Sequence, residues 1–128
     1  MSKTSKKILI VDDEPDMLSF LATFLQDNGF EIISAVDGKD CFEKAKKFHP
    51  DLITLDISMP EESGVKAFRN IQETEETKDI PVIIITGISK DFKKFIHTRK
   101  HVQPPIAYIE KPIDTSELLA KINEILKL

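Results

Sequence analysis

Short, largely aliphatic runs recur along the chain, at residues 8–11, 52–55, 82–85 and 106–109. Runs of this length and composition are typical of strands that are buried on both faces of a sheet. The segment at 31–35 mixes polar and apolar residues and follows Asn28 and Gly29, a pair that ends helices well. We therefore expect a fifth strand there, at an edge of the sheet.

Five further segments carry apolar residues at steps of three and four, which predicts amphipathic helices. Their apolar positions are Met17, Leu18, Phe20, Leu21, Phe24 and Leu25; Phe42, Ala45 and Phe48; Phe68 and Ile71; Phe92, Phe95 and Ile96; and Leu118, Leu119, Ile122, Ile125 and Leu126. Each stripe can cover a sheet face while Lys and Glu side chains point to water. Strands and helices thus alternate along the chain.

Five β-α units are too few for a closed eight-unit barrel, so the pattern predicts an α/β fold with an open, doubly wound parallel sheet. We expect a (βα)5 arrangement with the flavodoxin-like strand order 2-1-3-4-5 and helices on both faces, in three layers α/β/α. With 128 residues the chain has the usual size of one domain, and we expect residues 1–128 to form it, with 1–6 as a flexible N-terminus.

The composition of the chain limits where the protein can reside and what it can bind. No apolar run approaches the roughly 20 residues needed to cross a bilayer, and the N-terminus has no signal-peptide pattern, so we expect a cytoplasmic protein without a membrane partner. Eighteen basic and 22 acidic residues give a net charge of −4, which argues against non-specific nucleic-acid binding. A single cysteine, Cys41, excludes an internal disulfide, and we expect it to be a packed side chain.

Positive charge gathers in the expected fourth helix, at Lys90, Lys93, Lys94, Arg99 and Lys100 together with His97 and His101. We interpret this stretch as a solvated helix face. A docking face for an acidic partner is the alternative, and DNA binding is the least favoured interpretation because no DNA-reading motif accompanies the charges.

Acidic residues follow two of the buried strands directly. Asp12, Asp13 and Glu14 come after the first strand, and Asp56 comes after the third. In the expected strand order these ends are neighbours at the carboxyl edge of the sheet, where ligands bind in such folds. Clustered carboxylates repel one another, and Mg²⁺ relieves this conflict because it prefers a few hard oxygen ligands. We interpret Glu14 as a helix cap; for the three aspartates, capping or simple exposure is the alternative.

A hydroxyl and an ammonium group reach the same edge. The fourth strand ends in Thr86, and the fifth leads to Lys111 and Pro112. A carboxylate can act as a nucleophile and form an acyl phosphate, while a metal ion and a lysine neutralise charge on the phosphoryl oxygens. Alone, Thr86 is an ordinary β-branched strand residue and Lys111 an ordinary solvated lysine. Together with the aspartates they predict a phosphoryl-transfer site.

The chain resembles a response-regulator receiver domain over nearly its whole length. The resemblance is carried by the acidic pair Asp12 and Asp13, by the segment DISMPEESG at 56–64, by Thr86, and by YIEKP at 108–112. These match the family's acidic pair, its Asp-x-x-Met-Pro-x-x-x-Gly loop, its switch Thr or Ser, and its aromatic-x-x-Lys-Pro ending. The family pattern departs at Gly87, where Ala is common.

The resemblance implies a role for each matching residue. Asp56 is the expected phospho-acceptor; Asp12, Asp13 and Asp56, with the backbone carbonyl of Ser58, are the expected ligands of Mg²⁺, for which Mn²⁺ can substitute. Lys111 is expected to contact the phosphoryl group. Its bond to the following proline is expected to be cis. No other cofactor is implied.

The resemblance also implies a switch and partners. Thr86 and Tyr108 are expected to change position when Asp56 is phosphorylated, and so to alter the surface formed by the fourth helix, the fifth strand and the fifth helix. The expected phosphoryl donor is a sensor histidine kinase or a histidine phosphotransfer protein. The expected recipient of the signal is a downstream protein or a fused output domain, and a phosphorylation-dependent homodimer is a further option.

Such a domain catalyses its own phosphorylation and dephosphorylation without being an ordinary enzyme. The expected fifth helix ends close to Leu128, so we expect no output domain within the 128 residues.

Three other classes of protein remain open at this point. A haloacid-dehalogenase-like phosphatase also uses an aspartate nucleophile and Mg²⁺, but it requires alternating acids after the first strand, whereas Asp12 and Asp13 are adjacent. A flavodoxin-like cofactor module has the same topology, but those two acids would repel a flavin phosphate. A degenerate receiver that only binds partners is disfavoured by the intact set of acidic residues, Thr86 and Lys111.

Overall fold

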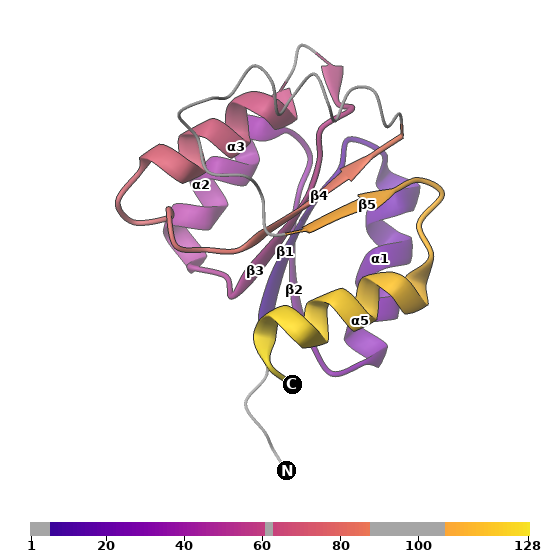
Figure 1. The fold of residues 1–128 in the computed structure, drawn as a ribbon. Coiled ribbons are helices and arrows are strands. Elements are labelled where there is room, and N and C mark those ends of the chain that lie inside the picture. Colours follow the sequence, from indigo (N-terminus) through magenta and orange to yellow (C-terminus); the bar gives the residue numbers. More distant parts are fainter. Residues whose placement is uncertain (1–5, 61–62, 88–106) are drawn as a thin grey trace.

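The computed structural model of the chain describes residues 6–60, 63–87 and 107–128. Within these ranges strands and helices alternate except between the last two strands, whose connection at 88–106 lies outside the described residues (Figure 1). The elements are β1 Lys7–Val11, α1 Pro15–Asp27, β2 Glu31–Ala35, α2 Gly38–Phe48, β3 Leu52–Asp56, α3 Ser63–Glu73, β4 Val82–Thr86, β5 Ala107–Glu110 and α5 Thr115–Leu126. Each strand coincides with a predicted run to within one residue at either end, and the four described helices carry four of the predicted stripes.

All five strands belong to one parallel sheet in the order β2-β1-β3-β4-β5, which confirms the predicted topology. β1, β3 and β4 hold the interior positions and are buried along almost their whole length. β2 lies at an edge and is only partly buried, with Ala35 as its one fully buried residue, which agrees with its mixed sequence. The register pairs Val11 with Leu55, so the residues that follow β1 and end β3 lie side by side.

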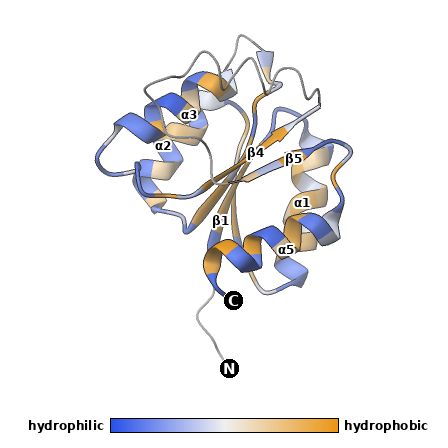
Figure 2. Ribbon diagram, viewed as in Figure 1, coloured by the Kyte–Doolittle hydropathy of each residue, from blue (hydrophilic) through white to orange (hydrophobic). Residues whose placement is uncertain are grey.

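Helices cover both faces of the sheet. α2 and α3 lie on one face, and α1 and α5 lie on the other (Figure 1). Alternate residues of each interior strand face opposite sides, so Leu9 and Ile53 belong to the core under α2 and α3, whereas Ile8 and Leu52 belong to the core under α1 and α5. Figure 2 shows the apolar strands between helices whose outer surfaces are hydrophilic. This is the predicted three-layer α/β/α arrangement.

Residues next to the helix ends form the capping interactions, and one sequence prediction about them is wrong. Asp37 and Asp114 accept hydrogen bonds from backbone N–H groups at the start of α2 and α5. Glu14 occupies the corresponding position of α1, but its side chain makes no capping bond, so its interpretation as a side-chain cap is wrong. α1 instead begins with Pro15, which needs no N–H partner. Asn28 and Gly29, whose φ is +93°, end α1 as predicted.

Some predictions concern residues outside the described ranges. These are the fourth helix with Phe92, Phe95 and Ile96, the basic stretch around it, and the flexibility of residues 1–5. In the described part of the chain the longest helix is α1, with 13 residues, and no helix there has both the length and the apolar character required to span a bilayer.

Candidate functional site

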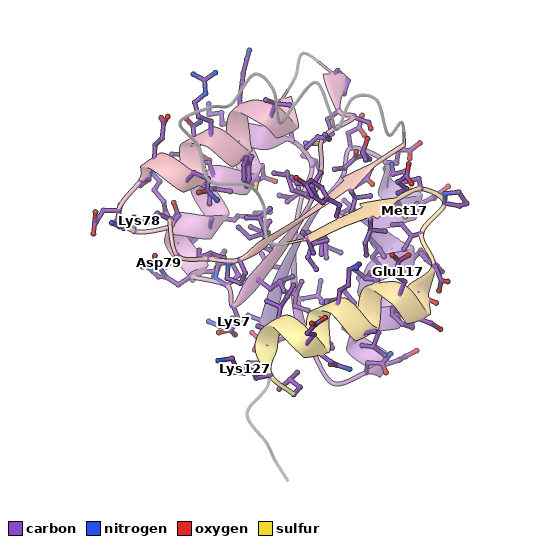
Figure 3. All side chains as sticks on the ribbon, in the orientation of Figure 1. Lys7, Met17, Lys78, Asp79, Glu117 and Lys127 are labelled. Atoms are coloured by element: carbon purple, nitrogen blue, oxygen red, sulfur yellow. The ribbon has the colours of Figure 1, made fainter. Side chains whose placement is uncertain are left out.

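The three aspartates singled out in the sequence meet at the carboxyl edge of the sheet. Asp12 and Asp13 follow β1, Asp56 is the last residue of β3, and one carboxylate oxygen from each lies within 4.8 Å of the other two. The side chains of Asp12 and Asp56 are almost fully buried, whereas Asp13 is exposed. Because Asp13 is the exposed member, the cluster opens to solvent on its side. Lys7 and Lys127 lie at the opposite end of the molecule, where β1 begins and α5 ends (Figure 3).

Lys111 brings a positive charge into this cluster. Its Nζ lies 3.0 Å from Oδ2 of Asp56 and 3.6 Å from Oδ2 of Asp12. Its backbone N–H donates to the carbonyl oxygen of Thr86 at 2.8 Å, which attaches the segment after β5 to the end of β4. The bond between Lys111 and Pro112 is cis, as the resemblance implied.

Backbone groups hold the other oxygen of each buried carboxylate. Oδ1 of Asp56 accepts from the N–H of Ser58 at 2.8 Å, and Oδ1 of Asp12 accepts from the N–H of Glu14 at 2.9 Å. Both bonds join residues two apart, an Asx-type turn that fixes the side chain relative to its own loop. Consequently each Oδ2 is directed at the Lys111 ammonium, while each Oδ1 is anchored.

Charge and burial shift the pKa of two groups at the site. The pKa of Asp12 is raised, mainly because burial disfavours the ionised form and also because Asp56 is negative; the Glu14 N–H and Lys111 oppose this shift. Burial lowers the pKa of Lys111, but its hydrogen bond to Asp56 and the charges of Asp56 and Asp12 outweigh burial, so the net shift is upward. Lys111 is therefore a stable cation beside carboxylates that repel one another.

The donor set fits a divalent cation. Three carboxylates supply hard oxygen ligands from one side, and the open side at Asp13 leaves room for water and for phosphate oxygens. Mg²⁺ favours this combination of one or two carboxylates, several waters and a phosphate. The cluster can therefore bind a metal ion.

Gly64 supports the site in a way that the sequence interpretation missed. A Cβ atom at this position would collide with the carbonyl oxygen of Asp56 and with Cα of Ile57, so α3 packs its second residue directly on the end of β3. Such close approach of two backbone segments requires glycine. The position of Gly64 at the end of the 56–64 motif was visible in the sequence, but the contact that requires it was not.

The side chain of Ser58 makes a second unexpected contact. Its Oγ accepts a hydrogen bond from the backbone N–H of Gly87 at 3.3 Å, which joins the loop after β3 to the residue after β4. The sequence interpretation had assigned Ser58 only a backbone role. Together with the bonds Ser58 N–Asp56 and Lys111 N–Thr86, this contact ties the carboxyl ends of β3, β4 and β5 into one unit.

Thr86 and Tyr108 lie on one face of the sheet. Tyr108 is the register partner of Ile84, and Thr86 follows Ile84 by two residues, so the side chains of Thr86 and Tyr108 are diagonal neighbours. Thr86 is fully buried, whereas Tyr108 is partly buried against the core under α2 and α3, and burial raises the pKa of its hydroxyl. The two residues are thus adjacent, near the carboxyl end of β4, where the carbonyl oxygen of Thr86 accepts the hydrogen bond from Lys111 N–H.

Comparisons with known proteins agree with this geometry. Residues 8–123 match the response regulator receiver domain family. The protein PilH of Pseudomonas aeruginosa is 35% identical over 120 residues, which cover 94% of this chain and 97% of PilH. Several other curated relatives are about twice as long as the matched region, so this chain spans only 49%, 48% and 52% of their lengths.

Solved structures show the same fold. The chemotaxis response regulator CheY4 of Vibrio cholerae superimposes with a TM-score of 0.82 at 25% identity, covering 95% of this chain and 99% of CheY4. The receiver domain of the sensor histidine kinase PA1611 from Pseudomonas aeruginosa gives a TM-score of 0.85 at 22% identity, covering 98% of this chain and all of that domain, 100%. That structure holds a magnesium ion in its active-site cleft. The chain belongs to the response regulator receiver domain family, the phospho-acceptor domains of two-component signalling.

Proposed function

We propose that Asp56 is the residue that accepts the phosphoryl group. The observation that carries this proposal is the contact of 3.0 Å between the buried Asp56 carboxylate and Lys111, next to Asp12 and Asp13. Among the three clustered aspartates, Asp56 has the shortest contact to the ammonium group. A phosphoryl group on Asp56 is therefore the one that Lys111 can neutralise best.

The reaction follows from these positions. An oxygen of the Asp56 carboxylate attacks the phosphorus of a phosphohistidine, the P–N bond breaks, and an acyl phosphate forms. Lys111 moves from the carboxylate to the phosphoryl oxygens, whose charge it neutralises. The Ser58 N–H holds the other carboxylate oxygen, so the nucleophile is oriented before the donor arrives. Hydrolysis of the acyl phosphate restores the carboxylate.

Asp12, Asp13 and Asp56, with the backbone carbonyl of Ser58, are the proposed ligands of Mg²⁺, and Mn²⁺ should substitute. When bound, the ion neutralises negative charge that builds up on the phosphoryl oxygens. The magnesium ion in the PA1611 receiver domain supports this assignment, since that domain has the same fold. The clustering of three carboxylates supports it more directly, because a divalent cation bound among them would offset their mutual repulsion.

The proposed output is a change of surface near β5. Thr86 reports the phosphoryl group because it lies at the end of β4, and Tyr108 responds because it is the diagonal neighbour of Thr86 on the same sheet face. The affected surface comprises β5, α5 and residues 88–106. Residues 88–106 lie outside the described ranges. The phosphoryl donor is a sensor histidine kinase or a histidine phosphotransfer protein in the cytoplasm.

The recipient of the signal is a separate downstream protein or a fused output domain, and we propose that the 128 residues act as one receiver domain. The nearly complete match to the length of PilH supports a free-standing receiver, whereas the half-length matches support a receiver in a larger regulator. A size-exclusion measurement before and after phosphorylation tests for a homodimer.

Intact mass spectrometry tests the acceptor. After incubation with acetyl phosphate and Mg²⁺, the wild type should gain the mass of one phosphoryl group, and EDTA should prevent the gain. Asp56→Asn should gain nothing. Asp79→Asn changes an exposed aspartate that precedes the amino end of β4, away from the carboxyl ends that carry the site, and should behave as the wild type (Figure 3). Phosphorylation of Asp56→Asn at the wild-type level would overturn the proposal. Release of many phosphates per protein from a phosphate ester would indicate a hydrolase instead.

A further inference from the structure

α2 and α3 lie on the sheet face opposite to α1 and α5 (Figure 1). A hollow between them is lined by residues within 38–42 of α2 and 63–70 of α3. Its volume is about 300 Å³, and Phe42 and Ala67 form the apolar part of its wall. The hollow is built into the packing of the two helices: Gly38 N–H donates to Oγ of Ser63, and a Cβ atom at Gly38 would collide with Ser63. The two helices are therefore held at a fixed separation here.

The rim of the hollow is positively charged although the chain is acidic. Lys39 and Lys66 line it from opposite helices, and none of the described residues that line it is acidic. Nζ of Lys46 lies 4.6 Å from the centre of the Phe42 ring and adds a third cation beside the wall. The chain as a whole has a net charge of −4, so this region has the opposite sign from the average surface.

These lysines are not neutralised by neighbours within the described ranges. The ion pairs found there involve Lys44, Lys78 and Lys111. The two acids at the start of α2 are engaged elsewhere, because Asp37 caps the helix and Asp40 pairs with Lys44. Asn70 adds a side-chain amide at the rim. An apolar wall flanked by unpaired cations is complementary to an anionic group attached to an apolar one.

We propose that this hollow is a docking site for an acidic segment of a partner protein. An apolar side chain of the segment rests on Phe42 and Ala67, and its flanking carboxylates pair with Lys39 and Lys66. A volume of about 300 Å³ lies at the lower limit of pockets that enclose small ligands. The lysines are exposed at the rim, where they can reach groups on a partner surface. This site is separate from the Asp56 cluster and needs no phosphorylation to bind.

The test is an NMR titration of the full ¹⁵N-labelled chain in its unphosphorylated form. The probe is the blocked tripeptide acetyl-Asp-Leu-Asp-amide, added to about 10 mM so that binding with a Kd of about 1 mM approaches saturation. Saturable shifts should appear at the amides of Gly38, Lys39, Ala67 and Asn70. The matched peptide acetyl-Asn-Leu-Asn-amide should shift them far less.

Paired variants test the charge contribution. Lys39→Gln with Lys66→Gln should weaken binding by about threefold to tenfold, the combined effect expected of two exposed ion pairs. The control, Lys47→Gln with Lys127→Gln, changes the net charge equally at positions that do not line the hollow and should bind as the wild type. Absence of saturable shifts at the hollow, equal shifts with the Asn peptide, or equal weakening in both variant pairs would each overturn the proposal. Thermal unfolding of both pairs verifies that they are folded.

Discussion

Nζ of Lys111 and Oδ2 of Asp56 lie 3.0 Å apart, although 54 residues separate them in the chain. Each group is immobilised by a backbone bond of its own residue or loop: Lys111 N–H bonds to Thr86, and Asp56 Oδ1 bonds to Ser58. The ion pair therefore connects the ends of β3 and β5 across β4. A change of charge at Asp56 acts directly on the β5 segment through this contact.

Lys111→Gln should destabilise the metal-free protein at neutral pH. It removes the cation that faces two nearly buried carboxylates, and loss of a charged hydrogen bond of this kind costs about 1.5–3 kcal/mol. Urea unfolding in EDTA at pH 7 measures the change. Lys121→Gln on α5 serves as the control and should have little effect. Mg²⁺ should recover more stability in Lys111→Gln than in the wild type; an equal gain in both would contradict the assignment of Lys111 as the resident counter-charge.

The raised pKa of Asp12 predicts a pH dependence of stability. A carboxyl group with a higher pKa in the folded than in the unfolded state stabilises the fold when protonated, and that contribution is lost as the pH rises from the ordinary value of 3.8 through the raised one. Asp12→Asn keeps an oxygen that can accept from the Glu14 N–H and removes the titration. In EDTA, the free energy of unfolding of Asp12→Asn relative to wild type should therefore increase across this window.

Urea unfolding of both proteins at a series of pH values from about 4 to 8 checks this expectation, since unfolded carboxyl groups titrate at the low end of that range. A difference between the two proteins that stays constant with pH would refute it. The addition of Mg²⁺ should stabilise the wild type and should leave Asp12→Asn with a smaller gain, because one proposed ligand has lost its charge.

Gly64→Ala should lower both stability and phosphorylation. The added methyl group would be forced against the backbone of Asp56 and Ile57, and overpacking of this kind costs about 1–3 kcal/mol. Alanine is intrinsically the better helix residue, so a loss of stability would identify the collision as the cause. Gly87→Ala is the control: a Cβ at Gly87 meets no described residue within 4 Å, and its effect should stay within about 0.5 kcal/mol. Unfolding midpoints and the rate of phosphorylation by acetyl phosphate measure the two effects.

Thr54→Val should stabilise the protein. The Thr54 hydroxyl lies in the middle of β3, is buried, and has no hydrogen-bond partner among the described residues. An unpaired buried hydroxyl costs about 1–3 kcal/mol, and valine has nearly the same shape and the same preference for strands. Its register partners Ile10 and Ile83 are both apolar. An unfolding free energy below that of the wild type would show that the hydroxyl has a partner, such as a buried water molecule.

The amino-acid sequence by itself determined the order of the elements, their type, and the gathering of Asp12, Asp13 and Asp56 at one edge. These follow from local periodicity and from the rule that parallel strands present their carboxyl ends together, so they need no knowledge of side-chain contacts. Pro15 and Gly29 marked helix ends for the same local reason. The assignment of Glu14 as a side-chain cap failed because the choice between competing hydrogen bonds depends on loop geometry.

Only the tertiary structure decided which atoms meet. The contact of Lys111 with both Asp56 and Asp12, the packing of Gly64 on β3, and the bond from Gly87 to Ser58 join residues from different loops. The unpartnered hydroxyl of Thr54 depends likewise on what packs around it. Such contacts are set by strand register and by the separation of helices from the sheet. Those distances arise from the close packing of the whole core, which no short stretch of sequence encodes.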